Sequence, residues 1–179
     1  MPVRSWRRAG TVLVAVAMTW SIIGCQPKGA SPALPPSGGL VVERVEVIDG
    51  DTVAVAGPGG DRQRVRIIGI DTPEVAHDGR PRECWAQEAT GALRALTEQA
   101  DEVRLVEDDA VGDRDDYGRL LRQVFVDDID VGEQLLAAGH ARRYKALSTA
   151  SPVAARYRLV ERQARTAGAG LWGACPRTG

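Results

Sequence analysis

Valines alternate with charged residues over residues 44–47, as in a half-buried β-strand, and residues 64–70 are rich in β-branched residues. The strands predicted in this region are 44–47, 52–55 and 64–70. Asp49 and Gly50 form a turn signal between the first two strands. Pro73 cannot donate a backbone hydrogen bond, so the third strand is predicted to end before it, which leaves Asp71–Glu74 in a loop.

Apolar residues recur at helical spacing in three later segments. The first helix is predicted to bury Ala86, Ala89, Leu93 and Leu96. Asp130 and Glu133 have the spacing of a capping box, which predicts the start of a second helix. Ser151 and Pro152 are predicted to supply the N-cap and first-turn proline of a third helix, which ends at Gly168.

Two further strands are predicted at 103–106 and 120–126. Five strands with a helix between the third and fourth follow the order of an OB-type Greek-key barrel. The predicted fold is therefore α+β, a five-stranded OB-fold β-barrel with three α-helices. The domain is expected to span 40–175, with 176–179 as a short tail.

Composition excludes several classes of protein. The 179 residues suffice for one domain with appendages. There are only two histidines, which argues against a histidine-rich zinc site, and neither a P-loop nor a GxSxG motif occurs. Residues 1–24 hold three arginines and no acid, so the remainder has 20 basic against 24 acidic residues. Bulk positive charge therefore does not drive ligand binding by the domain.

The N-terminus has the pattern of an export signal. Three arginines precede an uncharged stretch, 9–24, which is shorter than the roughly 20 residues of a membrane-spanning helix. Its end, Ile22–Cys25, resembles the lipobox of bacterial lipoproteins, which implies cleavage after a signal peptide of residues 1–24 and lipidation of Cys25. An ordinary secretory signal and an uncleaved anchor helix are the alternatives. We thus expect an extracytoplasmic protein, anchored to the cell membrane by its lipid or secreted.

The segment after Cys25 is predicted to be a tether. Residues 26–39 hold four prolines and three glycines. A segment of this composition cannot bury enough apolar surface to fold. At about 3.1–3.5 Å per residue, residues 26–39 could hold the domain up to roughly 45 Å from a membrane. The two other cysteines, Cys84 and Cys175, suggest a disulfide outside the cytoplasm, and two buried free thiols are the alternative.

Three segments hold residues suited to phosphate chemistry: Ile48–Val53, Arg66–Glu74 and Asp115–Arg119. Together, in this order, and with Gly170–Trp172 near the end, they resemble the thermonuclease (staphylococcal nuclease-like) family. The resemblance covers essentially the whole domain. It implies a sugar-nonspecific endonuclease that acts on DNA and RNA, breaks the P–O5′ bond and leaves 3′-phosphates. The expected protein is a monomer.

The resemblance assigns a role to six residues. The catalytic residues are Arg66, Glu74 and Arg119, and the Ca²⁺ ligands are Asp51, Asp71 and the carbonyl of Thr72. The chemistry agrees, since arginine meets phosphate oxygens with a planar charged fork and a carboxylate can deprotonate water. Hard oxygen donors without nearby histidine or cysteine suit Ca²⁺. Each residue also has a structural alternative, as a turn or loop acid or an ion-pair partner.

Three further features are open at this stage. Tyr117 and Tyr144 are candidate substrate-binding residues, although Tyr117 could simply cover the barrel. Segment 107–116 holds six acids and one arginine, and either weakens substrate binding or points away as a solvated loop. Segment 142–165 holds seven basic residues and one acid, and is either a nucleic-acid-binding patch or the polar face of a helix.

Two other classes of function compete with the enzyme. One is a binding module, a non-catalytic nucleic-acid-binding OB-fold lipoprotein, and the other is a structural lipoprotein of the cell envelope. All five side chains assigned to catalysis or metal binding are present in the sequence, which favours the enzyme.

Overall fold

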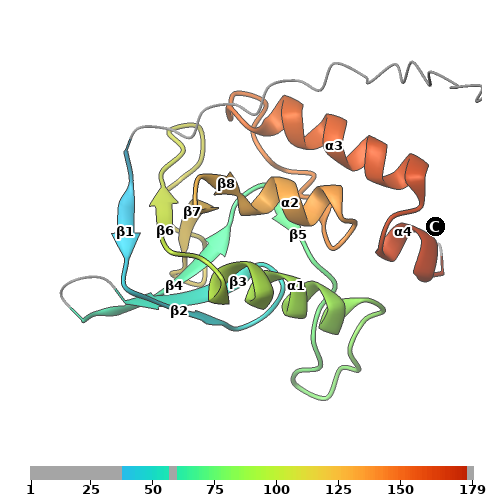
Figure 1. The fold of residues 1–179 in the computed structure, drawn as a ribbon, viewed down its shortest axis with the longest axis horizontal. Coiled ribbons are helices and arrows are strands. Elements are labelled where there is room, and N and C mark those ends of the chain that lie inside the picture. The colour runs from blue at the N-terminus through green and yellow to red at the C-terminus, as the bar shows by residue number, and fades with distance from the viewer. Residues whose placement is uncertain (1–37, 57–59, 177–179) are drawn as a thin grey trace, which may run out of the picture. The chain divides into compact units, whose positions relative to one another are not determined.

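The computed structural model describes residues 38–56 and 60–176 (Figure 1). The predicted signal peptide, Cys25 and most of the predicted tether therefore lie outside the described residues. None of the helices in the described ranges is long and apolar enough to cross a membrane.

Short strands alternate with four helices along the chain. The strands are β1 (Leu40–Val42), β2 (Arg44–Val47), β3 (Thr52–Ala56), β4 (Arg62–Ile67), β5 (Ile70–Asp71), β6 (Val103–Val106), β7 (Leu120–Val126), β8 (Ile129–Asp130) and β9 (Arg142–Arg143). The helices are α1 (Ala86–Glu98), α2 (Val131–Ala137), α3 (Ala154–Ala167) and α4 (Leu171–Ala174). All five predicted strands and all three predicted helices are present. The sequence did not indicate β1, β8, β9 and α4, and it placed β5 only within the predicted strand 64–70.

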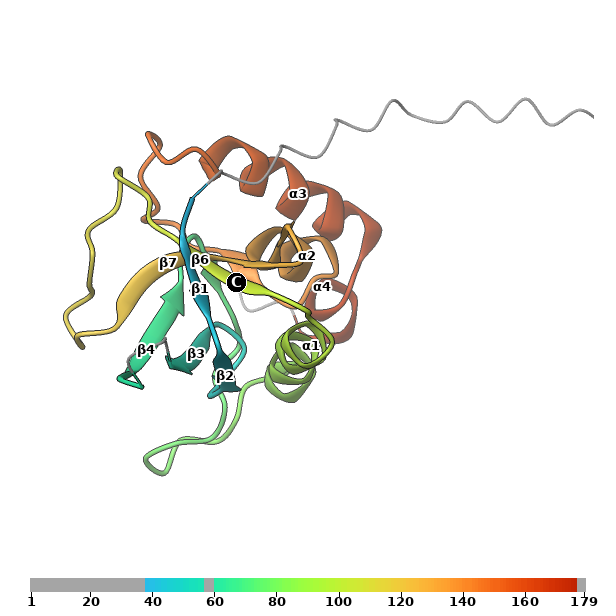
Figure 2. The same ribbon diagram turned by 60° about the vertical axis from the view of Figure 1, so that its left-hand side comes forward.

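The predicted five-stranded barrel is not confirmed, and no closed barrel is found among the described residues. Seven strands form one sheet in the order β1-β6-β7-β4-β3-β2, with β8 paired to β7, and β5 pairs with β9 separately. All pairings are antiparallel except that of β4 with β7. The pairing path ends at β1 and β2, which are neighbours along the chain and are separated by Glu43. Figure 2 shows β1 beside β6 and the helices gathered on one side of the strands.

The third predicted strand ends earlier than expected, because the backbone turns at Gly69. This glycine has a φ of +78°, and a Cβ atom there would lie 2.9 Å from the Tyr157 ring. The chain then resumes as β5 beside β9, so the predicted strand 64–70 is two strands, β4 and β5. The break turns the following loop toward the start of β3.

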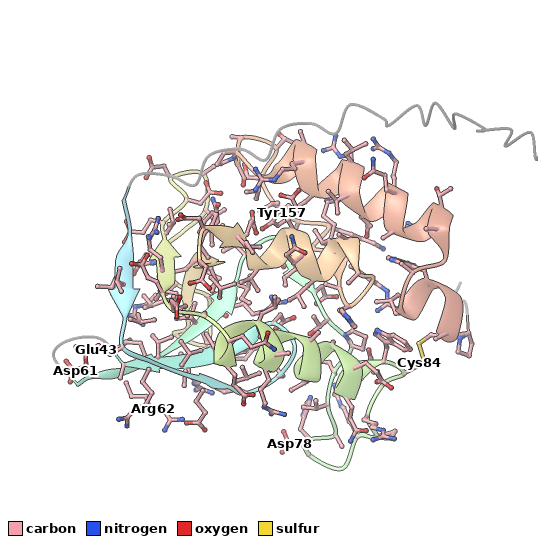
Figure 3. All side chains as sticks on the ribbon, viewed as in Figure 1. Glu43, Asp61, Arg62, Asp78, Cys84 and Tyr157 are labelled. Atoms are coloured by element: carbon pink, nitrogen blue, oxygen red, sulfur yellow. A yellow bond between two sulfur atoms is a disulfide. The ribbon has the colours of Figure 1, made fainter. Side chains whose placement is uncertain are left out.

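Tyr157 joins three parts of the core. Its ring is fully buried, and its hydroxyl donates a 2.7 Å hydrogen bond to Asp130 Oδ1 (Figure 3). The same carboxylate oxygen accepts from the backbone N of Glu133, which confirms the predicted cap of α2. Burial, together with the neighbouring Asp130 charge, raises the pKa of Tyr157 well above its ordinary value. A single side chain thus ties α3 to α2 and to the turn at Gly69.

The predicted N-cap of α3 is wrong. The helix begins after Val153, and the Ser151 hydroxyl donates instead to the buried Asp108 Oδ2 at 2.6 Å. The buried Asp108 carboxylate needs a hydrogen-bond donor, and the Ser151 hydroxyl supplies it. The predicted end at Gly168 is confirmed, with the glycine in the left-handed conformation.

Cys84 and Cys175 form the disulfide that the sequence predicted, across 91 residues (Figure 3). Replacing both by serine should lower the free energy of unfolding by about 3–4 kcal/mol, because the long loop no longer restricts the unfolded chain. Denaturant unfolding of the oxidised wild type and the double variant measures the difference. Two cysteines that are alkylated in the native protein without prior reduction would contradict the bridge.

Candidate active site

The turn between β2 and β3 places the Asp51 carboxylate inside the protein, with only 5% of the residue exposed. Asp49 Oδ1 accepts a 3.0 Å hydrogen bond from the Asp51 backbone N and shapes the turn. A Cβ atom at Gly50 would lie 2.7 Å from Thr72 Oγ1 and 3.0 Å from the Ala89 methyl group. The glycine therefore lets the loop after β5 and helix α1 approach the turn closely.

The Asp51 carboxylate binds donors from three segments. Its Oδ2 accepts from the Thr72 backbone N at 2.9 Å and from the Thr72 hydroxyl at 3.1 Å. Arg66 Nη2 lies 3.0 Å from the same oxygen. The Thr52 hydroxyl donates to Oδ1 at 3.1 Å. The structure thus brings three predicted site residues, Asp51, Thr72 and Arg66, into direct contact.

Arg66 is held in one orientation. Its Nη1 donates to the carbonyl oxygens of Ile67 and Ile70, both at 2.9 Å, and so bridges the break between β4 and β5. Its Nη2 also lies 3.4 Å from Asp71 Oδ1. One guanidinium nitrogen therefore sits within 3.4 Å of both predicted metal-binding carboxylates. Since the side chain is only 15% exposed, its charge is weakly screened by solvent.

Arg119 reaches the same site from the start of β7. Its Nε donates to Asp115 Oδ2 at 2.7 Å, and its Nη1 donates to Thr52 Oγ1 at 3.2 Å. Asp115 Oδ1 also accepts from the backbone N of Tyr117 and of Arg119, which fixes the turn. Burial raises the pKa of Asp115, but the hydrogen bonds and the charge of Arg119 outweigh this effect and leave the pKa below its ordinary value.

Thr52 and Asp115 were not identified as site residues from the sequence. Thr52 accepts from Arg119 and donates to Asp51, so it joins the second arginine to the buried carboxylate. Asp115 lies four residues before Arg119, but this segment is a turn and not a helix, so the spacing alone did not indicate the ion pair.

A pocket of about 360 Å³ opens beside the two arginines. Its lining includes Arg66, Arg119, Tyr117, Tyr144 and Leu147. Tyr117 is 79% exposed and lies 5.5 Å from the Arg119 guanidinium, so it does not cover the sheet. The pocket thus joins two positive charges to two aromatic rings, although the sequence left the place of both tyrosines open.

Glu74 lies apart from this group. Its side chain is 59% exposed, and its carboxylate is 3.9 Å from His77 Nε2. Its backbone N donates a 3.3 Å hydrogen bond to Glu83 Oε2, outside the group around Asp51. In residues 38–56 and 60–176, no hydrogen bond or ion pair joins the Glu74 side chain to Arg66, Asp51 or Arg119.

The acidic segment 107–116 is divided among several partners rather than forming one surface. Glu107 and Asp113 both bind Arg122, at 3.0 and 2.5 Å. Asp108 is buried against Ser151, and Asp115 holds Arg119. Asp116 lines the pocket. Three of its six acids, Glu107, Asp113 and Asp115, are thus paired with arginines, and the effect of the segment on substrate binding stays a prediction.

Comparison with known proteins agrees with this geometry. A family model described as staphylococcal nuclease homologue matches residues 64–174. The chain belongs to the staphylococcal nuclease homologue family. The match includes Arg66, Asp71 and Arg119, which the site brings together with the preceding Asp51.

Several curated relatives of this nuclease-family chain bear enzyme names. "Probable endonuclease lcl3" of Botryotinia fuckeliana is 35% identical over 114 residues, which cover 60% of this chain and 41% of the relative. "Thermonuclease" of Staphylococcus hyicus is 39% identical over 99 residues, 55% of this chain and 56% of the relative. "Endonuclease YncB" of Bacillus subtilis is 33% identical over 126 residues, which cover 70% of this chain and 58% of the relative. The chain thus spans about two-fifths of the first relative's length.

The nuclease-family site offers oxygen donors to a cation. Asp51 and Asp71 converge on one guanidinium nitrogen, so their carboxylates share one small region. The described residues contain no group of three or more histidine, cysteine, aspartate or glutamate side chains placed to hold a metal. Two carboxylates with a backbone carbonyl fit a hard cation that retains several waters, and do not fit a closed transition-metal site.

Burial raises the pKa of Asp51 to about 6, because desolvation outweighs the nearby Arg66 charge. The folded protein therefore holds this proton more tightly than the unfolded chain does. Stability from this group is present below the unfolded value, 3.8, and is lost as the pH rises through about 6.

Asp51→Asn should therefore stabilise the nuclease-family domain at pH 8 without added metal, by on the order of 2 kcal/mol. The gain should vanish near pH 4, where the wild-type carboxyl is protonated as well. Denaturant unfolding at both pH values in the presence of a chelator provides the measurement. Asp61→Asn is the control, because it changes an exposed carboxylate that lies just before β4. Equal stability changes at the two pH values would contradict the assignment.

Proposed function

We propose that this protein is a Ca²⁺-dependent endonuclease that hydrolyses phosphodiester bonds of DNA and RNA and leaves 3′-phosphates. One observation carries the proposal: Arg66 and Arg119 are both fixed on the Asp51–Thr52 pair at the edge of one pocket. Two preorganised guanidinium groups suit an anionic phosphate and the charge that grows on it during cleavage. The family membership and the relatives' names support the same activity.

In the proposed reaction, water attacks phosphorus and the P–O5′ bond breaks. Arg66 and Arg119 bind the phosphate oxygens, and Arg119 stabilises the charge of the transition state. Glu74 takes the proton of the attacking water, and the departing O5′ takes up a proton from solvent. Tyr117 and Tyr144 contact the neighbouring nucleotide from the wall of the pocket.

Asp51, Asp71 and the Thr72 carbonyl would hold the Ca²⁺. When bound, the cation polarises the phosphate and favours an ionised water. The chain's own contribution is to keep both carboxylates in place, since Arg66 and Thr72 fix Asp51 before any ligand arrives. This arrangement also gives the buried Asp51 charge a partner in the absence of metal.

We further propose that the protein is exported by its signal peptide, 1–24, and anchored outside the cytoplasm by a lipid on Cys25. The Cys84–Cys175 disulfide supports this location, because such bonds persist in oxidising compartments. Residues 25–39 would then tether a monomeric domain to the membrane.

A non-catalytic nucleic-acid-binding lipoprotein is the second candidate. The exposed position of Glu74, without a contact to the arginines or to Asp51 in the described part of the chain, favours this alternative. Its carboxylate must reach a water on the bound phosphate if the chain is an enzyme.

Glu74→Gln decides between the two candidates. If Glu74 is the general base, turnover of single-stranded DNA should fall by about 10²–10⁴ while DNA affinity is retained. Arg119→Ala should lower turnover by about 10²–10³ and weaken binding as well, because it removes a charge that contacts the phosphate. Single-turnover cleavage and equilibrium binding, each with and without Ca²⁺, separate these effects.

Asp78→Asn is the matched control, since Asp78 is a fully solvated carboxylate in the same loop as Glu74. It should leave both turnover and affinity unchanged. A wild-type protein that binds DNA and leaves it intact in Ca²⁺ at mildly alkaline pH would overturn the enzyme and support the binding module.

Cys25→Ala tests the proposed anchor. The natural protein should partition with membranes and carry acyl mass on its N-terminal peptide, whereas the variant should be unprocessed or released. Cell fractionation and mass spectrometry report the two results. Soluble wild-type protein with an unmodified Cys25 would remove the anchor from the proposal.

A further inference from the structure

The basic segment 142–165 separates into arginines with partners and arginines without them. Arg143 pairs with Glu161, and Arg156 pairs with Asp130 and Glu133. The acids nearest to α3 are thereby neutralised from within the domain. These arginines stabilise the fold and are not available to a ligand.

Three other arginines form a stripe on the outer face of α3. Arg158, Arg162 and Arg165 follow one another at spacings of four and three residues, and all are exposed. Within the described ranges, no carboxylate lies within 4 Å of their guanidinium groups. Arg165 also lies 4.6 Å from the Trp172 ring, which orients it without removing its charge. We refer to these three residues as the α3 stripe.

The α3 stripe lies outside the candidate active site. A different side of the helix, about 100° around its axis from Arg158, carries Tyr157, which packs under Gly69, a residue of the pocket wall. None of the three arginines lines that pocket. Leu159, next to the stripe, is 44% exposed, which places an apolar side chain among the charges.

The chain enters the domain next to the end of β6. Gly39, just before β1, lies against the Leu105 carbonyl of β6, the partner strand of β1. Just beyond β6, Asp108 accepts from Ser151, which lies three residues before the start of α3. An anchor that precedes β1 would therefore hold this side of the domain toward a membrane.

We propose that the α3 stripe, which contributes no residue to the catalytic pocket, docks on the phosphate groups of an anionic membrane surface. The proposal rests on the membrane anchoring proposed above. The proposed tether is long enough, since roughly 45 Å at full extension exceeds the length of α3, about 21 Å at 1.5 Å per residue. Three exposed positive charges beside an exposed leucine match the headgroup region in charge and polarity.

The test compares the full chain with the variant Arg158→Gln/Arg162→Gln/Arg165→Gln on two kinds of vesicle. One contains phosphatidylcholine alone and the other also contains phosphatidylglycerol. At low ionic strength, the wild type should prefer the anionic vesicles, and the variant should lose about 100-fold of that preference, at roughly fivefold per arginine. High salt should abolish the difference. The N-terminus is the same in both proteins, so its contribution cancels in the ratio.

Arg44→Gln/Arg62→Gln/Arg64→Gln is the matched control. It removes the same charge from exposed positions on β2 and β4, and should retain the preference for anionic vesicles. Equal losses in the two triple variants, or no preference in the wild type, would overturn the proposal. Reduced affinity for a single-stranded oligonucleotide with unchanged vesicle binding would also overturn it, and would assign the α3 stripe to nucleic acid.

Cleavage is measured on the same preparations. The α3 variant should cleave a short oligonucleotide as the wild type does, because its three positions lie outside the pocket. A wild type without nuclease activity would contradict the proposed function, yet would leave the vesicle comparison as decisive as before.

Discussion

A buried carboxylate needs a donor for each of its oxygens, and Asp51 takes its donors from three separate segments. Thr72 supplies two of them from the loop after β5, Arg66 a third from β4, and Thr52 a fourth from β3. Leaving any of these donors unplaced would expose a buried charge to a large desolvation cost. The geometry of the site therefore follows from the need to supply hydrogen-bond donors to the Asp51 carboxylate. The raised pKa of Asp51 shows that the cost is incompletely offset.

The helices support this site through Tyr157. Its ring lies under Gly69, where β4 ends, and its hydroxyl binds Asp130 at the start of α2. The break at Gly69 in turn allows Arg66 to reach the carbonyl of Ile70. Packing in the helical layer thus sets the direction of the arginine. A stable core and a preorganised site are parts of the same arrangement.

Charge in this domain is sorted by pairing. Most acids of segment 107–116 bind arginines or a serine within the fold, and the acids near α3 bind Arg143 and Arg156. Within the described residues, the arginines at the pocket edge are held by Asp51, Asp71 and Asp115, whereas those of the α3 stripe have no carboxylate partner. A small net charge is therefore compatible with local clusters of positive charge, because charges act locally once their neighbours are neutralised.

The sequence by itself determined the five main strands, the helices α1, α2 and α3 and the local cap at Asp130, because alternation, helical spacing and capping depend on near neighbours. Its motifs also indicated Asp51, Arg66 and Arg119. Only the tertiary structure decided that these three converge through Thr52, that the third strand breaks at Gly69, and which charges are paired. Those outcomes depend on contacts between residues far apart in the chain. Examples are the packing of the Tyr157 ring on Gly69 and the hydrogen bond from the Ser151 hydroxyl to the Asp108 carboxylate. Spacing along the sequence carries no record of such contacts.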